Sequence, residues 1–452
     1  MDSTLDIGRR VLQMIWDPEP TNDMVRDQPV WCLGSSYRLS TPSSSRVDRT
    51  STAKTTAPTP ASSATDTSSP TTDGPATTTP APARLPETPP DSISSSFDSS
   101  LAYEEAPKDG GWPPAFLDDF ESRIWMTYRS EFEPIPKSQD PKALASLSFS
   151  MRLKTQLSDQ PGFASDSGWG CMIRSGQSLL ANAMLMQRLG RGWRRRTQEV
   201  EEKKLLAMFA DDPRAPYSIH KFVQHGATAC GKYPGEWFGP SATARCIQAL
   251  TNKNESNLRV YSTGDGPDVY EDNFMKIARP DGKDFQPTVI LVSTRLGIDK
   301  ITPVYWEALV ASLQMPQSIG IAGGRPSSSH YFIGVQGLHF FYLDPHFTRP
   351  ALPYHEDVME YTPDEVDSCH TRKLRRLHVK EMDPSMLIGF LIRDMDDWEE
   401  WRRSVKHVQG KSIIHVSDHD PVAQCEAQGS SFLDQVEAMS DDEDDGDTVL
   451  DE

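Results

Sequence analysis

Residues 42–90 consist almost entirely of serine, threonine, proline and alanine, and this stretch limits what the chain can fold into more than any other feature. It has no apolar periodicity, so burial cannot offset the conformational entropy that ordering would cost. We therefore predict a disordered insertion over residues 38–112. It separates a short N-terminal segment, residues 1–37, which we expect to pack on the core, from the rest of the chain.

The end of the chain is strongly acidic. Its last segment, SDDEDDGDTVLDE, has eight acidic and no basic residues in thirteen positions, and self-repulsion favours an open conformation. We predict a disordered acidic tail over residues 416–452, which leaves residues 113–415 as the folded domain. The formal net charge of −19 argues against nucleic-acid binding, because a nucleic-acid footprint needs basic residues to displace counterions. A protein partner is expected instead.

The cysteines indicate a reducing compartment. They are spread widely along the chain instead of forming the dense framework of a small secreted domain. The six are Cys32, Cys171, Cys230, Cys246, Cys369 and Cys425. The first ten residues lack the apolar core of a signal peptide, and no apolar run is long enough to cross a bilayer. We expect a soluble cytoplasmic protein without a metal or other cofactor, since Cys369 and His370 lack the further ligands of a tetrahedral zinc site.

Helical and strand patterns alternate in the middle of the chain. Residues 172–190 are apolar around most of the helical circumference and end on a glycine, which predicts a buried helix. Helical spacing also predicts a helix that carries Phe116, Phe120, Ile124 and Tyr128. The run PTVILVST and residues 330–344 are rich in β-branched and aromatic residues and predict strands. The fold class is therefore α+β.

Cys171 is the first candidate for chemistry. It stands in SDSGWGCMIRSGQ, behind two glycines and a tryptophan at the start of the buried helix. A free thiol of pKa about 8.5 is mostly protonated at neutral pH, but a helix N-terminus and a nearby imidazolium lower this to roughly 3.5–7.5. The alternative is that Cys171 is one more buried structural cysteine, and this segment alone leaves both interpretations open.

A histidine partner is offered by FYLDPHF, which places Asp344 and His346 two residues apart. In an extended backbone, such residues point to one face, so the aspartate can hold one ring nitrogen while the other faces the thiol. Asp-Pro-His is also typical of an Asx turn. His330, at the start of HYFIGV, is a second candidate base. A helix-start cysteine followed roughly 170 residues later by a histidine is the layout of papain-like hydrolases.

Four segments, in this order, resemble the autophagins, the cysteine proteases of autophagy: DSGWGCMIRSGQ, GEWFGPS, MPQSIGIAGGRPSSSHYFIG and FYLDPH. The resemblance covers roughly residues 116–415, and VWCLG near the N-terminus also matches. It implies a papain-like core with a small additional subdomain and a ubiquitin-like autophagy modifier as substrate. The enzyme would cleave after the modifier's C-terminal glycine, both to activate the precursor and to release it from phosphatidylethanolamine.

The resemblance also implies roles for individual residues. Cys171 would be the nucleophile, His346 the general base and acid, Asp344 the residue that orients the histidine, and Tyr128 an oxyanion-hole donor. Trp237 would cover the substrate glycine. A gating loop would consist of Arg325, Pro326, Ser327 and Ser328. Without the resemblance, core packing with a satisfied hydroxyl is the preferred explanation of Tyr128. Trp237 is then equally well explained as a core aromatic, and the loop as a turn.

Other functions remain open at this point. A transglutaminase-like or amidase-like enzyme of the same broad fold would also use Cys, His and Asp, and the chain could instead be a non-enzymatic interaction protein with disordered arms. The resemblance further implies only transient membrane contact, through the lipidated substrate. A basic run could meet acidic lipid headgroups, or it could be a solvated helix end balanced by Glu199, Glu201 and Glu202. The run is Arg191, Arg194, Arg195 and Arg196.

Overall fold

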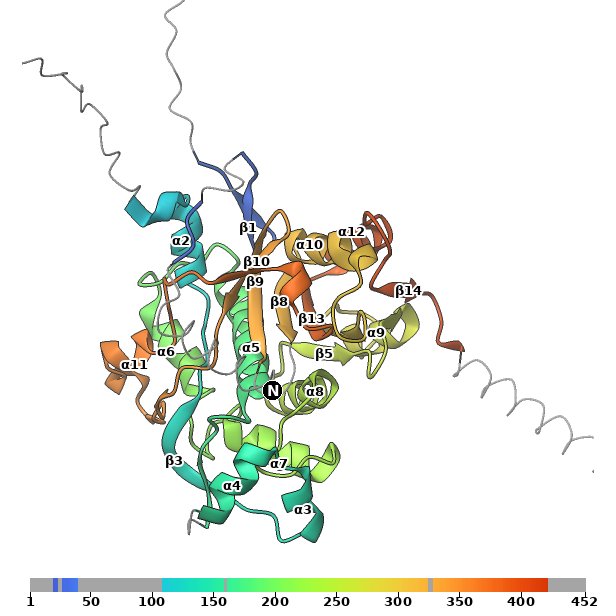
Figure 1. The fold of residues 1–452 in the computed structure, drawn as a ribbon. Helices are drawn as coiled ribbons and strands as arrows, with labels where there is room; N and C mark the ends of the chain where they lie inside the picture. Colours follow the sequence, from blue (N-terminus) through green and yellow to red (C-terminus); the bar gives the residue numbers. More distant parts are fainter. Residues whose placement is uncertain (1–18, 23–26, 40–107, 158–160, 324–327, 422–452) are drawn as a thin grey trace, which may run out of the picture. The chain divides into compact units, whose positions relative to one another are not determined.

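The computed structural model describes residues 19–22, 27–39, 108–157, 161–323 and 328–421. Helices and strands are mixed along these residues, which confirms the predicted α+β class (Figure 1). Most of the predicted insertion and of the acidic tail lies outside the described residues. Within the described part, no helix combines the length and the apolar character that a membrane span requires.

One large sheet forms the centre of the fold. Its main strands follow the order β12 (Arg376–His378), β10 (His339–Leu343), β9 (His330–Gln336), β8 (Ser318–Gly323), β13 (Ser385–Ile392), β7 (Thr288–Arg295) and β5 (Arg259–Ser262). Neighbours along this path are antiparallel, except for the parallel pair β5 and β7. At the N-terminal end of the chain, β1 (Val30–Cys32) pairs with β9 and with β2 (Ser35–Tyr37).

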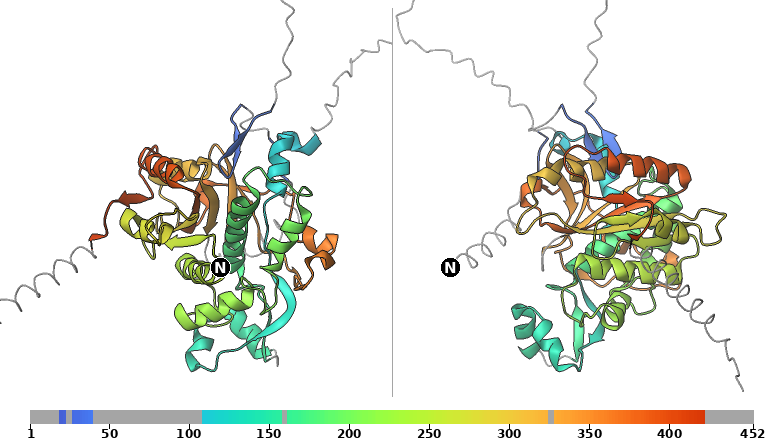
Figure 2. Two further views of the ribbon diagram at one scale, coloured as in Figure 1. Left: turned by 180° about the vertical axis from the view of Figure 1, so that it is seen from behind. Right: turned by 90° about the vertical axis from the view of Figure 1, so that its right-hand side faces the viewer.

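Helices cover both faces of this sheet, and β13 shows how. A Cβ at Gly389 would lie 2.7 Å from Ile319 and 3.2 Å from Leu179 of helix α5 (Cys171–Leu189). Its neighbours Ile388 and Phe390 point the other way, into a small cavity between α10 (Trp306–Gln314) and α12 (Met395–Lys406). Helix α8 (Pro240–Asn254) packs beside α5 on the first face. The sheet is therefore buried between two helical layers (Figure 2).

Helix α5 agrees with the predicted buried helix over residues 172–190. It begins one residue earlier, at Cys171, and ends at Leu189; the following Gly190 caps it by donating its N–H to the Met186 carbonyl. A Cβ at Gly176 would lie 2.4 Å from Thr243 of α8, so this glycine lets the two helices approach closely. Close packing of this kind holds the N-terminus of α5, and with it Cys171, in a fixed position.

The predicted helix from Phe116 to Tyr128 is only partly present. Helix α2 spans Pro114–Glu121, and the chain then becomes extended. Polar side chains of α5 accept the backbone N–H groups there: Asn182 from Ile124 at 3.0 Å and Ser178 from Met126 at 2.9 Å. These hydrogen bonds take the place of the backbone hydrogen bonds that a helix would form in this segment. Ile124 and Tyr128 are buried as the apolar pattern indicated, but in an extended segment that leads into β3 (Arg129–Pro136).

Two smaller sheets and several helices complete the described fold. Strand β3 lies between β4 (Gly162–Ser165) and β11 (Arg349–Pro350), and β6 (Asp268–Tyr270) pairs with β14 (His415–Ser417). The remaining α-helices are α3 (Pro141–Ser146), α4 (Phe149–Leu157), α6 (Glu199–Ala207), α7 (Ile219–Ala229), α9 (Glu271–Ala278) and α11 (Pro363–Asp367). The β3–β4 pair matters for the site, because Tyr128 precedes one strand and Cys171 follows the other.

Candidate active site

The segment before Cys171 is shaped by Asp166. The Asp166 carbonyl accepts the N–H groups of Trp169 at 3.1 Å and Gly170 at 2.8 Å, which turns the chain into α5. A Cβ at residue 170 would lie 2.4 Å from the Asp166 carboxylate, so only glycine fits directly before the cysteine. Gly168 has a φ of +93°, which L side chains rarely adopt. Gly168 and Gly170 are therefore structural requirements of this turn.

A buried ion network fixes the same segment. Arg174, on the first turn of α5, is bonded to Asp166 at 2.7 Å and to Asp211 at 2.7 Å, and all three side chains are almost completely buried. Asp166 also accepts the backbone N–H of Arg129 at 2.7 Å, which joins β3 to the start of α5. Sequence reasoning missed this network. The only signal was a charged residue at position 174 within an apolar helix.

We expect Asp166→Asn to lower the free energy of unfolding by about 3 kcal/mol, because it removes a charge from a buried ion network. Chemical denaturation measures this loss. The matched control is Asp212→Asn, at a solvent-exposed ion pair with Arg214, where about 1 kcal/mol or less is expected. Equal small effects of the two substitutions would contradict the structural role assigned to Asp166.

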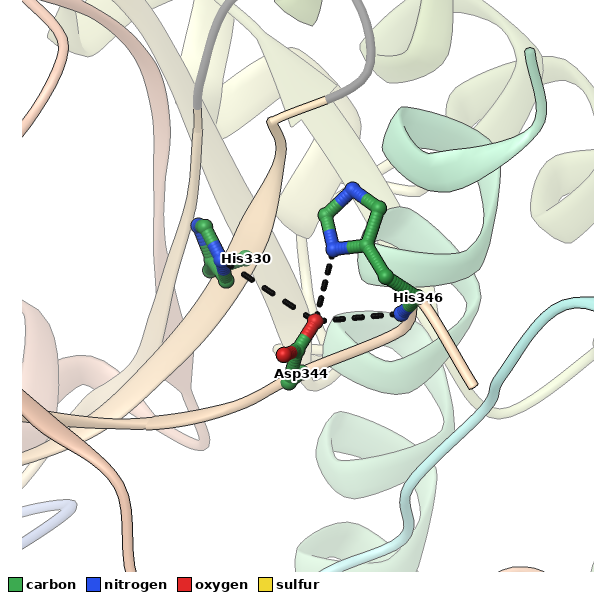
Figure 3. A group of neighbouring side chains, drawn as sticks. All are labelled: His330, Asp344 and His346. Atoms are coloured by element: carbon green, nitrogen blue, oxygen red, sulfur yellow. Dashed lines mark hydrogen bonds and ion pairs between the residues drawn. The ribbon is translucent and has the colours of Figure 1, made fainter. Parts of the chain in front are cut away.

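Asp344 and His346 form the polar centre of the site (Figure 3). Asp344 Oδ1 accepts the His346 Nδ1–H at 2.6 Å and also the His346 backbone N–H at 3.0 Å. The second bond closes a turn directly after β10. The expected extended backbone is therefore wrong, and the Asx-type turn is present. The turn does not compete with the histidine contact, because one carboxylate oxygen makes both bonds.

The second ring nitrogen of His346, Nε2, lies next to the Cys171 thiol. His346 Nε2 is buried and, within the described part of the chain, has no partner other than Cys171. Burial alone would raise the pKa of Cys171, but the contact with His346 lowers it by more. Hydrogen bonds from the Ser329 backbone N–H and the Tyr128 hydroxyl lower it further, so the pKa of the thiol lies below its ordinary value. Burial lowers the pKa of His346, whereas Asp344 and Cys171 raise it, to about 10. The lowered pKa of Cys171 and the raised pKa of His346 both favour transfer of the thiol proton to the imidazole.

His330 lies beside this group but is less well placed. Its Nε2 is 4.0 Å from Asp344 Oδ1, compared with 2.6 Å for His346 Nδ1, and its ring packs on Tyr342 with 4.5 Å between centroids. Burial lowers the pKa of His330 to about 4, with Asp344 acting in the opposite direction. His330 is thus neutral when His346 is charged. The geometry favours His346 as the partner of the thiol.

His330, Asp344 and His346 also offer three ligand atoms within 4.8 Å of one another. This donor set is compatible with a metal ion such as zinc. The shortest contact in it is the 2.6 Å hydrogen bond between His346 and Asp344, which a bound cation would have to replace. Binding of a cation there would compete with the pairing of His346 and the thiol, and the expectation of a metal-free enzyme stays a prediction.

Tyr128 reaches the site as the resemblance implies. Its ring packs edge to face against His346, with 5.4 Å between centroids, and its hydroxyl lies next to Cys171 and the Gly168 backbone. Burial, and after it the neighbouring Cys171, raises the pKa of the hydroxyl far above its usual range. The hydroxyl therefore stays protonated and can donate a hydrogen bond to a developing oxyanion.

Trp237 is connected to the site only indirectly. It lies between α7 and α8 and is half-buried, and its indole N–H is buried without a hydrogen-bond partner in the described residues. Gly235 in the same segment packs against the Phe163 ring, where a Cβ would be 2.5 Å away. Phe163 in turn contacts Trp169, two residues before Cys171, with 5.9 Å between centroids. This series of contacts positions the Trp237 segment relative to the thiol.

The expected gating loop lies mostly outside the described residues, which include only its last member, Ser328, and not Arg325, Pro326 or Ser327. Ser329 follows directly and is fully buried. Its hydroxyl donates to Ser175 Oγ of α5 at 3.1 Å. One end of the loop is therefore anchored one helical turn after Cys171.

A buried thiol at the N-terminus of a central helix, facing a histidine–aspartate pair at a strand end, defines a cysteine hydrolase of the papain-like class. Residues 113–404 match the Peptidase C54 catalytic domain. The cysteine protease ATG4 of Pyricularia oryzae is 61% identical over 479 residues, which cover 98% of this chain and 97% of that protein. The probable cysteine protease ATG4 of Cryphonectria parasitica is 64% identical over 443 residues, covering 96% and 94%.

The chain belongs to the peptidase C54 family and is a cysteine peptidase. This confirms the resemblance to the autophagins inferred from the four sequence segments. A third relative agrees: the probable cysteine protease ATG4 of Chaetomium globosum is 63% identical over 446 residues, covering 99% of this chain and 97% of that protein. Family membership removes the non-enzymatic interpretation. It also sets aside the transglutaminase-like and amidase-like alternatives as the main activity.

Proposed function

We propose that the protein cleaves the bond after the C-terminal glycine of a ubiquitin-like autophagy modifier. The observation that supports this best is the buried pair of Cys171 and His346, oriented by Asp344, in a chain of the C54 family. The Cys171 thiolate attacks the glycine carbonyl, and His346 protonates the departing amine. A water molecule, deprotonated by His346, then hydrolyses the thioester and frees the glycine carboxylate.

One thioester intermediate serves two substrates, because only the leaving amine differs. In the precursor, the amine belongs to the peptide that follows glycine, and in the lipidated modifier it belongs to phosphatidylethanolamine. We therefore propose both activation of the precursor and delipidation. The Tyr128 hydroxyl and the N–H groups at the start of α5 stabilise the oxyanion of each tetrahedral intermediate.

We propose a cytoplasmic location for the enzyme. We propose that it acts there in autophagy and in cytoplasm-to-vacuole transport, at the sites where autophagosomes form, with a further pool in the nucleus. No cofactor takes part in the reaction as written, since thiol, imidazole and water supply every group. The partner is the modifier, either free or conjugated to lipid.

Mass spectrometry of two reactions tests the proposal. The purified chain is incubated with a modifier that carries a C-terminal peptide extension, and separately with the modifier conjugated to phosphatidylethanolamine in vesicles. Each reaction should give a product whose mass ends at glycine, and prior alkylation with iodoacetamide should block both. Products that end at another residue, or products that form after alkylation, would contradict the proposal. Release of ammonia from glutamine side chains would instead indicate an amidase.

Trp237→Ala should lower kcat/KM for the precursor by about tenfold and weaken discrimination against substrates with a larger residue in place of glycine. In the wild type, the Trp237 indole would cover the substrate glycine and leave a slot too narrow for a larger side chain. Removing the indole opens this slot. The measurement compares glycine and alanine substrates for the wild type and the variant, together with the melting temperature. Unchanged kinetics with a lowered melting temperature would show that Trp237 is a core aromatic only.

A further inference from the structure

Helices α3 and α4 carry three exposed apolar side chains that the peptidase chemistry does not explain. Phe149 is 82% exposed, Leu153 48% and Leu144 44%. Phe149 and Leu153 are four residues apart in α4 and so share one face of the helix. Met151, on the opposite face of α4, is buried, as are Ala143 and Leu147. The hairpin thus has its own packed side and still presents an apolar stripe to solvent.

This α3–α4 hairpin, residues 140–157, projects away from the large central sheet (teal in Figure 2). It joins β3, which begins directly after Tyr128, to β4, which ends at Ser165 shortly before Cys171. At the usual rise per residue, the eight residues of β3 span at most about 25 Å between the Tyr128 end of the site and the hairpin. The Tyr233 hydroxyl donates to Asp140 at 2.6 Å, which ties the hairpin to the segment that carries Trp237.

The charge of the hairpin differs from that of the whole chain. Residues 137–157 contain four basic residues and one acidic residue, in a protein of net charge −19. They are Lys137, Lys142, Arg152 and Lys154, with Asp140. The Asp140 carboxylate is already engaged, because it accepts the Lys142 backbone N–H and the Tyr233 hydroxyl. Arg152 donates to the Leu147 carbonyl at 2.8 Å and so holds α4 against the end of α3.

Three of the four arginines in the other basic run of the chain form ion pairs within the fold. Arg191 and Arg194 pair with the buried Asp119 at 2.7 and 2.8 Å, and Arg195 pairs with Glu121 at 2.9 Å. Their partners are therefore not the glutamates at 199, 201 and 202 that the sequence suggested. Because Asp119 and Glu121 belong to α2, these ion pairs hold the three guanidinium groups against that helix. The three arginines are therefore less free to bind lipid headgroups.

We propose that the α3–α4 hairpin docks on the surface of an anionic phospholipid bilayer. Leu144, Phe149 and Leu153 enter the boundary between headgroups and acyl chains, and Lys142 lies at the level of the phosphates. Apolar side chains on one helical face with flanking basic residues are the pattern of interfacial membrane helices. This docking rests on the proposed function. A peptidase whose substrate is joined to a phospholipid must work next to the membrane, and the hairpin would hold the enzyme there.

Sedimentation with bare vesicles, without any modifier, tests the docking directly. The full-length chain should bind vesicles of phosphatidylcholine and phosphatidylserine more strongly than vesicles of phosphatidylcholine alone, and added salt should weaken the binding. The double variant Phe149→Ser/Leu153→Ser should bind about tenfold less, and Lys142→Glu should also bind less. The control is Ile298→Ser, which removes a side chain that is 80% exposed elsewhere and should change nothing. Equal binding to both vesicle types, or wild-type binding by the double variant, would overturn the proposal.

Cleavage assays separate this proposal from its rivals. The double variant should keep the wild-type melting temperature and kcat/KM for the soluble precursor, because both side chains are exposed, but should release the modifier from vesicles more slowly. Equal losses on the soluble and vesicle-bound substrates would mean that the hairpin docks the modifier instead of the membrane, which also overturns the proposal. If the wild type cleaved neither substrate, the proposed function would fail, whereas the vesicle sedimentation would still decide the docking.

Discussion

Replacing Cys171 by serine will abolish cleavage, with a fall in kcat of about 10⁴-fold or more. Serine keeps nearly the same volume in a buried position and leaves the His346–Asp344 hydrogen bond in place. Its hydroxyl, however, has a pKa far above that of a thiol, so it does not form the anion that attacks the carbonyl. Product formation and the melting temperature are measured together, and only the first should change.

The matched control is Cys230→Ser, which changes a half-buried cysteine at the end of α7 and should leave cleavage unchanged. A normal rate for Cys171→Ser would remove the proposed nucleophile. A rate lost in both variants would point to a structural cause common to the two sites, and the melting temperatures would reveal it.

The second large effect concerns which histidine serves the thiol. His346→Ala should abolish turnover and slow alkylation of Cys171 at neutral pH by more than tenfold, since each unit of pKa is a tenfold change in thiolate. In the wild type, the pKa of the thiol is lowered by His346 in spite of burial. Without the imidazolium, burial acts with little opposition and raises this pKa, so alkylation should require alkaline solution. The rate of iodoacetamide labelling as a function of pH measures the shift.

His330→Ala is the control for this experiment and should leave the alkylation profile close to that of the wild type, because His330 is neutral and 4.0 Å from Asp344. The wild-type pH–rate profile should fall on the acid side as the thiolate is protonated, and on the alkaline side near about 10, where His346 loses its proton. If His330→Ala moves the alkylation profile and His346→Ala does not, the assignment of the base is wrong.

Long buried elements were the most predictable part of the fold. Helix α5 and strand β7 have continuous apolar runs that few other structures can accommodate, and both lie where the sequence indicated. The segment from Ile124 to Tyr128 was mistaken for helix because its apolar spacing is helical. What overrides that spacing is tertiary: Asn182 and Ser178, more than fifty residues away, bind its backbone. No local pattern carries this information.

The site was predictable where its members are close in sequence and not where they come together only in the fold. Asp344 and His346 were paired correctly, although through a turn instead of an extended backbone. The network of Asp166, Arg174 and Asp211 was missed, because Asp211 reaches Arg174 from a different part of the chain. The path from Trp237 to the thiol runs through Gly235, Phe163 and Trp169, and such contacts have no spacing rule.

Covalent capture shows whether Cys171 attacks the carbonyl of a C-terminal glycine. A ubiquitin-like autophagy modifier whose C-terminal glycine carries an electrophile such as a vinyl ester is incubated with the full-length chain, and the adduct is mapped by mass spectrometry. We expect one modifier per chain, attached to Cys171, with none on Cys171→Ala. Attachment to a different cysteine, or no adduct on the wild type, would contradict this expectation.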